Sequence, residues 1–226
     1  MWTEKKYIYS YCTWNPPLEF YAALHISGAD CMIEAQENYQ KRSWRNRALI
    51  LGPQGPQRLS LPLEKGKNHQ MPIREVKLAG RDDWRIEHLK TIQTNYQSSP
   101  YFEHYFPFIE ELYARTEDSL WSWNEAWSTF WLRTLGFEVN RQFTMDFRCG
   151  SAFAGIPIWD QKVLRQIRQY YSKDFWYPQV FEYKYGFQRE VSIMDALFCA
   201  GPETRSYFNT YYKESFSFSS LEKLME

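Results

Sequence analysis

The strongest constraint on the fold is a strand, a helix and a second strand predicted within the first 35 residues. Tyr7 to Tyr11 has the composition of a β-strand. Asn15, followed by two prolines, predicts a helix start with Asn15 as the cap, and Gly28 predicts its end. Asp30 to Glu34 then predicts a short buried strand. This order is typical of a βαβ unit, whose two strands are parallel.

The next segment predicts a β-hairpin. Arg45 to Leu51 and Arg58 to Leu63 both alternate, and residues 52–56 between them read Gly-Pro-Gln-Gly-Pro, a strong turn signal. Arg74 to Leu78 predicts a further strand. We therefore expect the βαβ unit and the hairpin to form one mixed sheet.

The middle of the chain has helical periodicity. A row at i+4 spacing contains Trp84, His88, Ile92 and Tyr96, and a longer apolar stripe precedes Gly136. Thr116 is the expected cap of the helix that carries this stripe. The fold class is thus mixed α/β, with a helical segment at about 82–135 inserted between β-rich parts. The chain of 226 residues fits a single domain, 1–226.

Five further elements are predicted after the helical segment. They are a strand at 137–143, a helix at 160–171, a strand at 177–183, a helix at 192–198 and a final helix at 203–212.

Charge and cysteine usage narrow the classes of function. Lys plus Arg and Asp plus Glu number 27 each, so we do not expect a protein that coats nucleic acid. The sequence contains no apolar run long enough for a transmembrane helix and no signal-peptide pattern, which predicts a cytoplasmic protein. The 4 cysteines and 4 histidines lack metal-ligand spacing, so we predict no metal and no cofactor.

The densest candidate site is a basic and aromatic cluster at 41–47. Lys41, Arg42, Arg45 and Arg47 place four cations within seven positions, beside Trp44. Guanidinium groups bind phosphates in bidentate geometry, and an indole stacks on a base or a sugar. The cluster is therefore either a diphosphate site or a charged run exposed to solvent.

Two groups are candidate bases, each with a structural alternative. Glu37, like Glu34, precedes the basic cluster and either takes a proton or neutralises the arginines. His88 lies on an apolar helix row and is either a base or a hydrogen-bonded core residue.

Three polar residues are candidates for substrate orientation. They are Asn46, Tyr96 and Asp195. Asp195 stands three residues after Ser192, so it also fits a capping box.

Four motifs follow one another along the chain. They are Ala29-Asp30 leading to residues 37–47; residues 54–63; Trp84, His88 and Tyr96 with Ser99-Pro100-Tyr101-Phe102 and Tyr105; and Tyr177-Pro178-Gln179 with Gly186-Phe187, residues 191–198 and Gly201-Pro202. In this order they resemble the WbqC-like family of bacterial surface-polysaccharide gene clusters. The sequences at 37–41 and 99–103 are similar to those of the family branch that is common in Bacteroidetes. This chain departs from many members at Gln36, where they carry Asp, and in residues 10–21.

The resemblance implies a transferase of surface-polysaccharide (O-antigen-like) biosynthesis, with glycyl or aminoacyl transfer to an amino sugar. Its partner would be a nucleotide- or lipid-diphosphate-linked sugar. In this hypothesis Lys41, Arg42, Arg45 and Arg47 hold the diphosphate, and His88 or Glu37 takes the amine proton.

Two other functions stay open from the sequence. One is a non-catalytic nucleotide-sugar or glycan binder, or a scaffold. The other is an RNA or single-strand nucleic-acid binder, against which the zero net charge counts. The sequence does not fix the oligomeric state.

Overall fold

The first two strands and the helix between them form the predicted βαβ unit in the computed structural model, which describes residues 7–64, 71–80, 83–147, 158–159 and 175–212. Strand β1 (Tyr7–Tyr11) pairs in parallel with β2 (Asp30–Glu34), in a register from Tyr7 opposite Asp30 to Tyr11 opposite Glu34. Helix α1 (Leu18–Ser27) connects them and ends at Gly28, whose φ of 59° suits glycine. The predicted parallel pair is confirmed.

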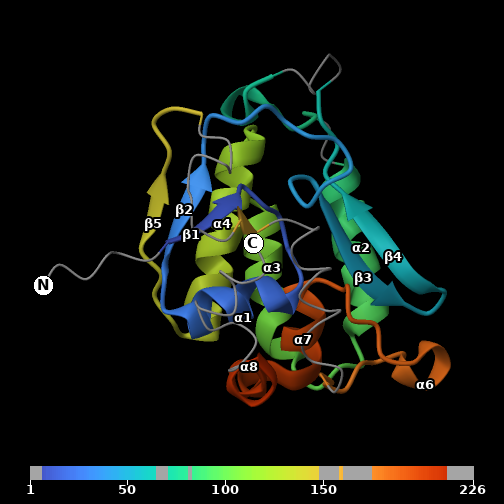
Figure 1. Cartoon of the computed structure of the whole chain (residues 1–226). Coiled ribbons are helices and arrows are strands. Elements are labelled where there is room, and N and C mark those ends of the chain that lie inside the picture. Colours follow the sequence, from blue (N-terminus) through green and yellow to red (C-terminus); the bar gives the residue numbers. More distant parts are fainter. Residues whose placement is uncertain (1–6, 65–70, 81–82, 148–157, 160–174, 213–226) are drawn as a thin grey trace, which may run out of the picture.

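The parallel sheet extends on both sides of this pair. Its order is β5-β2-β1-β6, with β5 at Arg141–Phe143 and β6 at Ile158–Trp159, and every pairing is parallel (Figure 1). Numbered along the chain, these strands lie in the order 3-2-1-4. The order therefore reverses between β1 and β6, which is a topological switch point.

The hairpin is confirmed, but it does not join the parallel sheet. Strands β3 (Arg47–Gly52) and β4 (Gly55–Ser60) form a separate two-stranded antiparallel sheet. Its apolar side chains pack with the helices instead, and Leu51 N donates to the Tyr96 hydroxyl at 3.0 Å. The expected single mixed sheet is thus two sheets (Figure 1).

Three long helices fill the predicted helical segment. They are α2 (Asp83–Tyr96), α3 (Phe102–Tyr113) and α4 (Leu120–Leu135). The stripe on α4 is buried and includes Trp123, Trp127 and Trp131. Ser119, rather than Thr116, caps α4 by accepting a bond from Ser122 N. Helix α1 and α4 lie on the same face of the sheet, because both line one small pocket with β2.

The expected cap of α1 is wrong. Helix α1 begins at Leu18, and Pro17 at its cap position offers no side-chain bond. Asn15 instead takes a left-handed φ of 46°, and its Oδ1 accepts a bond from Trp131 Nε1 at 2.6 Å. A tertiary contact with α4 has therefore replaced the local cap.

Two strand predictions are wrong and one is too long. Residues 175–181 form no strand, and α6 (Glu182–Tyr185) follows them. The 74–78 segment overlaps the short 3-10 helix η2 (Ile73–Glu75) and otherwise forms only isolated bridges, at Lys77 and Leu78. Strand β5 begins only at Arg141, since Phe137 packs against His25 instead.

The end of the described chain is helical, as predicted. It contains α7 (Ile193–Ala200), η4 (Gly201–Glu203) and α8 (Thr204–Tyr212). Helix α8 packs against α1 and α7. The helix predicted at 160–171 lies outside the described residues.

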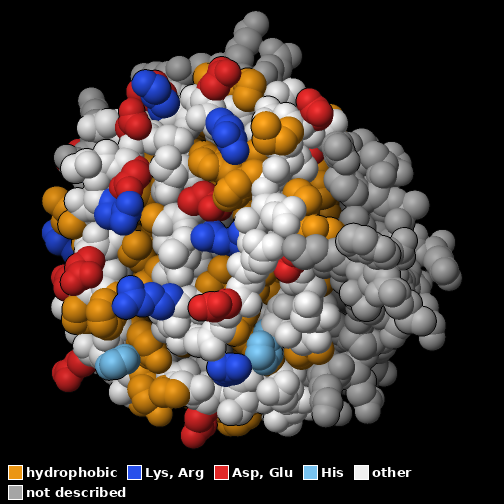
Figure 2. Space-filling view, turned by 90° about the vertical axis from the view of Figure 1, so that its left-hand side faces the viewer, with side chains coloured by type: hydrophobic (Ala, Val, Ile, Leu, Met, Phe, Trp, Pro, Cys, Tyr) orange, Lys and Arg blue, Asp and Glu red, His pale blue; other side chains and the backbone are white. Residues whose placement is uncertain are grey.

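The surface of the described part mixes charges of both signs with hydrophobic side chains, in line with the balanced composition (Figure 2). Among the helices that the structure describes, none combines the length and apolar character that a membrane crossing requires.

Candidate functional site

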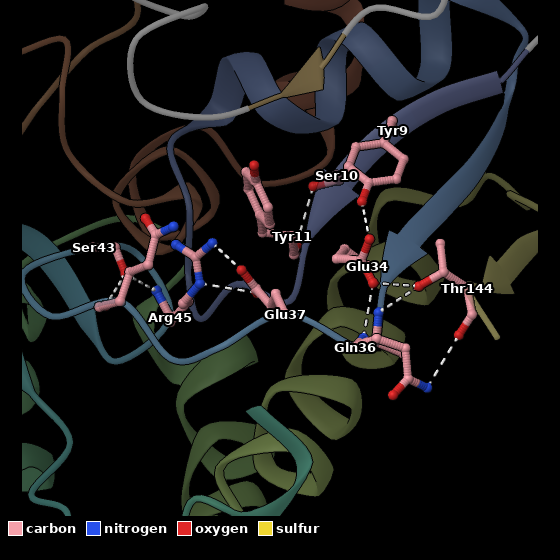
Figure 3. Close-up of polar contacts among 11 residues, drawn as sticks. Tyr9, Ser10, Tyr11, Glu34, Gln36, Glu37, Ser43, Arg45 and Thr144 are labelled. Carbon is pink, nitrogen blue, oxygen red and sulfur yellow. Dashed lines mark hydrogen bonds and ion pairs between the residues drawn. The ribbon is translucent and has the colours of Figure 1, made fainter. Parts of the chain in front are cut away.

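The candidate site lies at the carboxyl edge of the parallel sheet, where β1 ends at Tyr11 and β2 ends at Glu34 (Figure 3). Open α/β sheets bind ligands at this edge, beside the switch point in the strand order. Gln36, Glu37 and the loop that leads to β3 follow directly from β2. The chain therefore gathers its polar side chains where the topology favours a ligand.

Glu34 is the buried anchor of this edge. It is fully buried, and its carboxylate accepts bonds from the hydroxyls of Tyr9 and Thr144 and from Gln36 N at 2.8 Å. Thr144 directly follows β5, and its hydroxyl also accepts a bond from Ala35 N at 2.9 Å. Glu34 thus ties the middle of β1 to the ends of β2 and β5.

Glu37 and Arg45 form a buried ion pair across the loop. Arg45 Nε donates to Glu37 Oε1 at 2.9 Å, and an Arg45 terminal nitrogen donates to Oε2 (Figure 3). The guanidinium also lies 4.3 Å from the centroid of the Tyr11 ring. Glu37 is only 2% exposed and Arg45 5%. Arg45 is therefore already occupied by a carboxylate and an aromatic ring.

The pKa of Glu37 is raised to about 7 because burial penalises the carboxylate. Arg45 and the backbone N–H of Cys12 oppose this rise by stabilising the charged form. A carboxyl group with a pKa near neutrality is suited to proton transfer. Glu37 thus neutralises an arginine, as one interpretation predicted, and also has the pKa of a general base.

The other cations of the loop have different environments. Lys41 and Arg42 are exposed, and Arg42 has a left-handed φ of 60°. Arg47 is half-buried at the start of β3, and its Nε finds no hydrogen-bond partner within the described part of the chain. Strand β3 begins at Arg47, so Arg45 and Arg47 do not lie on the same strand.

The loop is held in place by its remaining members. Trp44 is half-buried, and its carbonyl accepts a bond from Trp14 N at 2.6 Å. Asn46 is buried, and its Nδ2 donates to the Leu61 carbonyl at 3.1 Å. Asn124 on α4 donates to the Arg45 carbonyl at 2.8 Å. Backbone and side-chain bonds therefore fix the loop on the sheet edge.

His88 lies in the aromatic core. Its ring stacks on Trp14 with a centroid distance of 5.8 Å, and its Nδ1 is 3.1 Å from the Tyr113 hydroxyl. Burial lowers its pKa to about 4, so the imidazole is neutral at pH 7. These contacts match the core interpretation of His88.

Asp195 and Tyr96 belong to a second buried network. The Asp195 carboxylate accepts bonds from the hydroxyls of Tyr96 and Tyr177 and from Gln179 Nε2, each at 2.8 Å. Burial raises its pKa to about 6, which these three donors oppose. Ser192 does cap α7, through Met194 N at 3.2 Å. Asp195 is thus a junction between α2, α7 and residues 175–179.

The sequence did not reveal several of these residues. Tyr9, Tyr11 and Thr144 reach the site through the strand register, which local patterns do not determine. Tyr177 and Gln179 were read as part of a strand. Glu34 was considered only as a neighbour of the basic cluster, although an acidic residue that ends a buried strand also signals a need for hydrogen-bond donors.

No group of three or more His, Cys, Asp or Glu side chains in the described residues could hold a metal ion.

A parallel sheet with a switch point, polar groups at its carboxyl edge and an inserted helical segment define the structural class, a mixed α/β protein. The chain belongs to the WbqC-like protein family, which matches residues 12–154. It is also 34% identical over 80 residues to the uncharacterized protein Rv1507c of Mycobacterium tuberculosis, a match that covers 35% of this chain and 34% of that protein. The chain therefore spans about a third of that relative. No solved structure matches.

Proposed function

We propose that the protein is a transferase of surface-polysaccharide biosynthesis that moves a small acyl group, such as glycyl, onto the amine of a diphosphate-linked sugar. The observation that carries this proposal is the placement of Glu37 and the basic loop together at the carboxyl edge of the parallel sheet. Membership of the WbqC-like family supports it, through the association of that family with polysaccharide gene clusters.

The cations that are not ion-paired would bind the diphosphate. Lys41 and Arg42 are exposed, and Arg47 has a nitrogen without a partner within the described residues. Trp44, which is half-buried in the same loop, would stack on the sugar. Arg45 is committed to Glu37, so its role would be to position the base.

Glu37 would act as the base in the transfer. The amine nitrogen attacks the carbonyl carbon of an activated acyl ester, a C–N bond forms, and the C–O bond to the leaving group breaks. Glu37 takes the amine proton and passes it to the leaving oxygen. Because Glu37 is only 2% exposed, the half-buried Tyr11 ring or the Arg45 side chain must move aside to admit the amine.

The other candidate residues would act indirectly. Asn46 positions the loop through Leu61, and Tyr96 positions the hairpin through Leu51. The hydrogen bond of His88 to Tyr113 and its low pKa favour Glu37 over His88 as the base.

The first test is a thermal-shift screen against nucleotide-linked and lipid-linked diphosphate sugars, since a ligand that binds the folded state raises Tm. We expect a rise that Lys41→Ala/Arg42→Ala weakens by about tenfold in apparent affinity, because two phosphate contacts are lost. The matched control is Lys90→Ala/Arg133→Ala, which removes two exposed cations from α2 and α4. An equal loss in both double variants would contradict a specific diphosphate site.

Turnover separates this proposal from a second candidate, a non-catalytic binder of the same sugars. The burial of Glu37 and its ion pair with Arg45 favour that alternative. Glu37→Gln should abolish acyl transfer and retain sugar binding if Glu37 is the base. If the unaltered protein binds these sugars but turns over no donor and acceptor pair, its function is non-catalytic sugar binding.

A further inference from the structure

Three side chains from distant segments form an aromatic platform beside the candidate site: Arg74 of η2, Trp121 of α4 and Phe143 of β5. The Trp121 and Phe143 rings lie 5.5 Å apart at 63°. The Arg74 guanidinium carbon is 4.8 Å from the Trp121 centroid and 6.0 Å from the Phe143 centroid. The segments converge because the start of α4 and the end of β5 lie at the same edge of the sheet.

The platform is open to solvent, and its cation has no ion-pair partner among the described residues. Phe143 is 38% exposed, and Arg74 is also exposed. In the described part of the chain, no carboxylate lies within 4.0 Å of the Arg74 guanidinium. The nearby Glu125 is paired with Arg141 at 3.1 Å. Arg74 therefore packs on aromatic rings and interacts with the Glu125 carboxylate only at longer range, so its hydrogen-bond donors are available to an anion.

The platform is continuous with the candidate site. Thr144, which follows Phe143, donates to Glu34, and Gln36 Nε2 reaches the Thr144 carbonyl at 3.5 Å. Ile73 N donates to the Glu37 carbonyl at 2.8 Å, which attaches η2 to the segment that carries Glu37. In Figure 2, which views the molecule from the β5 side, hydrophobic side chains gather in the upper half of the face, close to charged ones.

We infer that the aromatic platform binds the nucleobase of a nucleoside diphosphate, so that the substrate of the proposed function is nucleotide-linked rather than lipid-linked. A planar base can stack on the Phe143 ring or on the Arg74 guanidinium, since every base has a π-face and a guanidinium is planar. The free charge of Arg74 also complements a phosphate. An alkyl chain satisfies neither property, because it would remove the guanidinium from water without pairing it.

The inference rests on the proposed function and predicts which part of the ligand each region binds. The probes are ADP, GDP, CDP and UDP, with inorganic diphosphate as the baseless reference, titrated calorimetrically into the full chain. We expect at least one nucleoside diphosphate to bind about tenfold more tightly than inorganic diphosphate, which is within the range of one base stack. Phe143→Ala should remove that advantage and leave the affinity for inorganic diphosphate unchanged.

Control variants separate stacking from other effects. Phe108→Ala removes a comparably exposed phenyl ring on α3, at 45% exposure, and should change neither affinity. Arg74→Lys keeps the positive charge and removes the planar guanidinium. This variant should therefore lose most of the extra affinity for a nucleoside diphosphate over inorganic diphosphate. Circular dichroism of each variant checks that the fold is retained.

The outcomes also separate this inference from the proposed function. Equal affinities for all four nucleoside diphosphates and inorganic diphosphate, unchanged in Phe143→Ala, would overturn the platform and leave a diphosphate site intact. Binding of nucleoside diphosphates that depends on Phe143 but not on Lys41 and Arg42 would support the platform and contradict the diphosphate role of the loop. No binding of any probe would overturn both.

Discussion

Glu37 and Asp195 are both buried carboxyl groups with raised pKa values, but their surroundings differ. Glu37 is paired with the charged Arg45, and exposed residues flank it at Gln36 and Asn38. Asp195 is 0% exposed and held by three neutral donors. The region around Glu37 therefore opens toward solvent, whereas the network of Asp195 closes on itself.

This difference favours Glu37 over Asp195 for the proposed role of general base. A closed network of neutral donors fixes segments against one another, and here it joins α2, α7 and residues 175–179. A charged pair at a sheet edge keeps a titratable group next to a loop of cations. The family match covers residues 12–154, which include Glu37 and Arg45.

The largest expected effect comes from breaking the charged pair. Arg45→Ala leaves the Glu37 carboxylate buried without its partner, which should lower the free energy of unfolding by about 3–5 kcal/mol. Tyr177→Phe removes one neutral donor from Asp195 and should cost about 1–2 kcal/mol. Urea denaturation of both variants measures the contrast. Similar losses in the two variants would mean that the charge of Arg45 makes no difference.

A smaller effect should appear as a pH dependence of stability. Burial raises the pKa of Asp195 from 3.8 to about 6, so the folded state binds this proton more tightly than the unfolded state. The contribution of Asp195 is therefore fully present below pH 3.8 and is lost as the pH rises through about 6. Relative to Asp195→Asn, which does not titrate, the wild type should lose about 3 kcal/mol across this window.

Glu37 should behave with the same sign in a higher window, between 4.5 and about 7. Urea titrations of wild type, Asp195→Asn and Glu37→Gln at a series of pH values compare the two acids directly. A wild type that gains stability relative to either variant as the pH rises would show that the corresponding pKa is lowered by its donors rather than raised by burial.

The sequence predicted local features of the fold well and long-range partners poorly. The βαβ unit, the hairpin and α2 to α4 follow from periodicity and from turn residues such as Gly28 and Gly136, which act on their immediate neighbours. The burial of His88 also followed from its helix row. The partner of Asp195 on α2, Tyr96, is 99 residues away, and no local pattern encodes that approach.

The strand prediction at 177–183 was wrong for a related reason. Alternating aromatic residues favour a strand, but Tyr177 is placed by its bond to Asp195 and by packing against Phe187. The candidate site was only partly predictable. The charges at 37–47 identified the loop, whereas the pairing of Glu37 with Arg45 depends on how that loop folds back over the end of β1.

The smallest expected effect tests whether the strained backbone of Arg42, in the basic loop at 41–47, is retained because Arg42 binds a ligand. Arg42 holds a φ of 60°, which costs a residue with a side chain about 1–2 kcal/mol. Arg42→Gly should relieve this strain and, after the entropy cost of glycine, raise the free energy of unfolding by about 0.5–1 kcal/mol. Lys41→Gly, at a neighbouring exposed residue without a positive φ, should instead lower it. Both variants should weaken diphosphate binding in calorimetry, because each removes a cation. Greater stability together with weaker binding in Arg42→Gly would mean that the strained loop is retained for its ligand, and unchanged binding would remove Arg42 from the site.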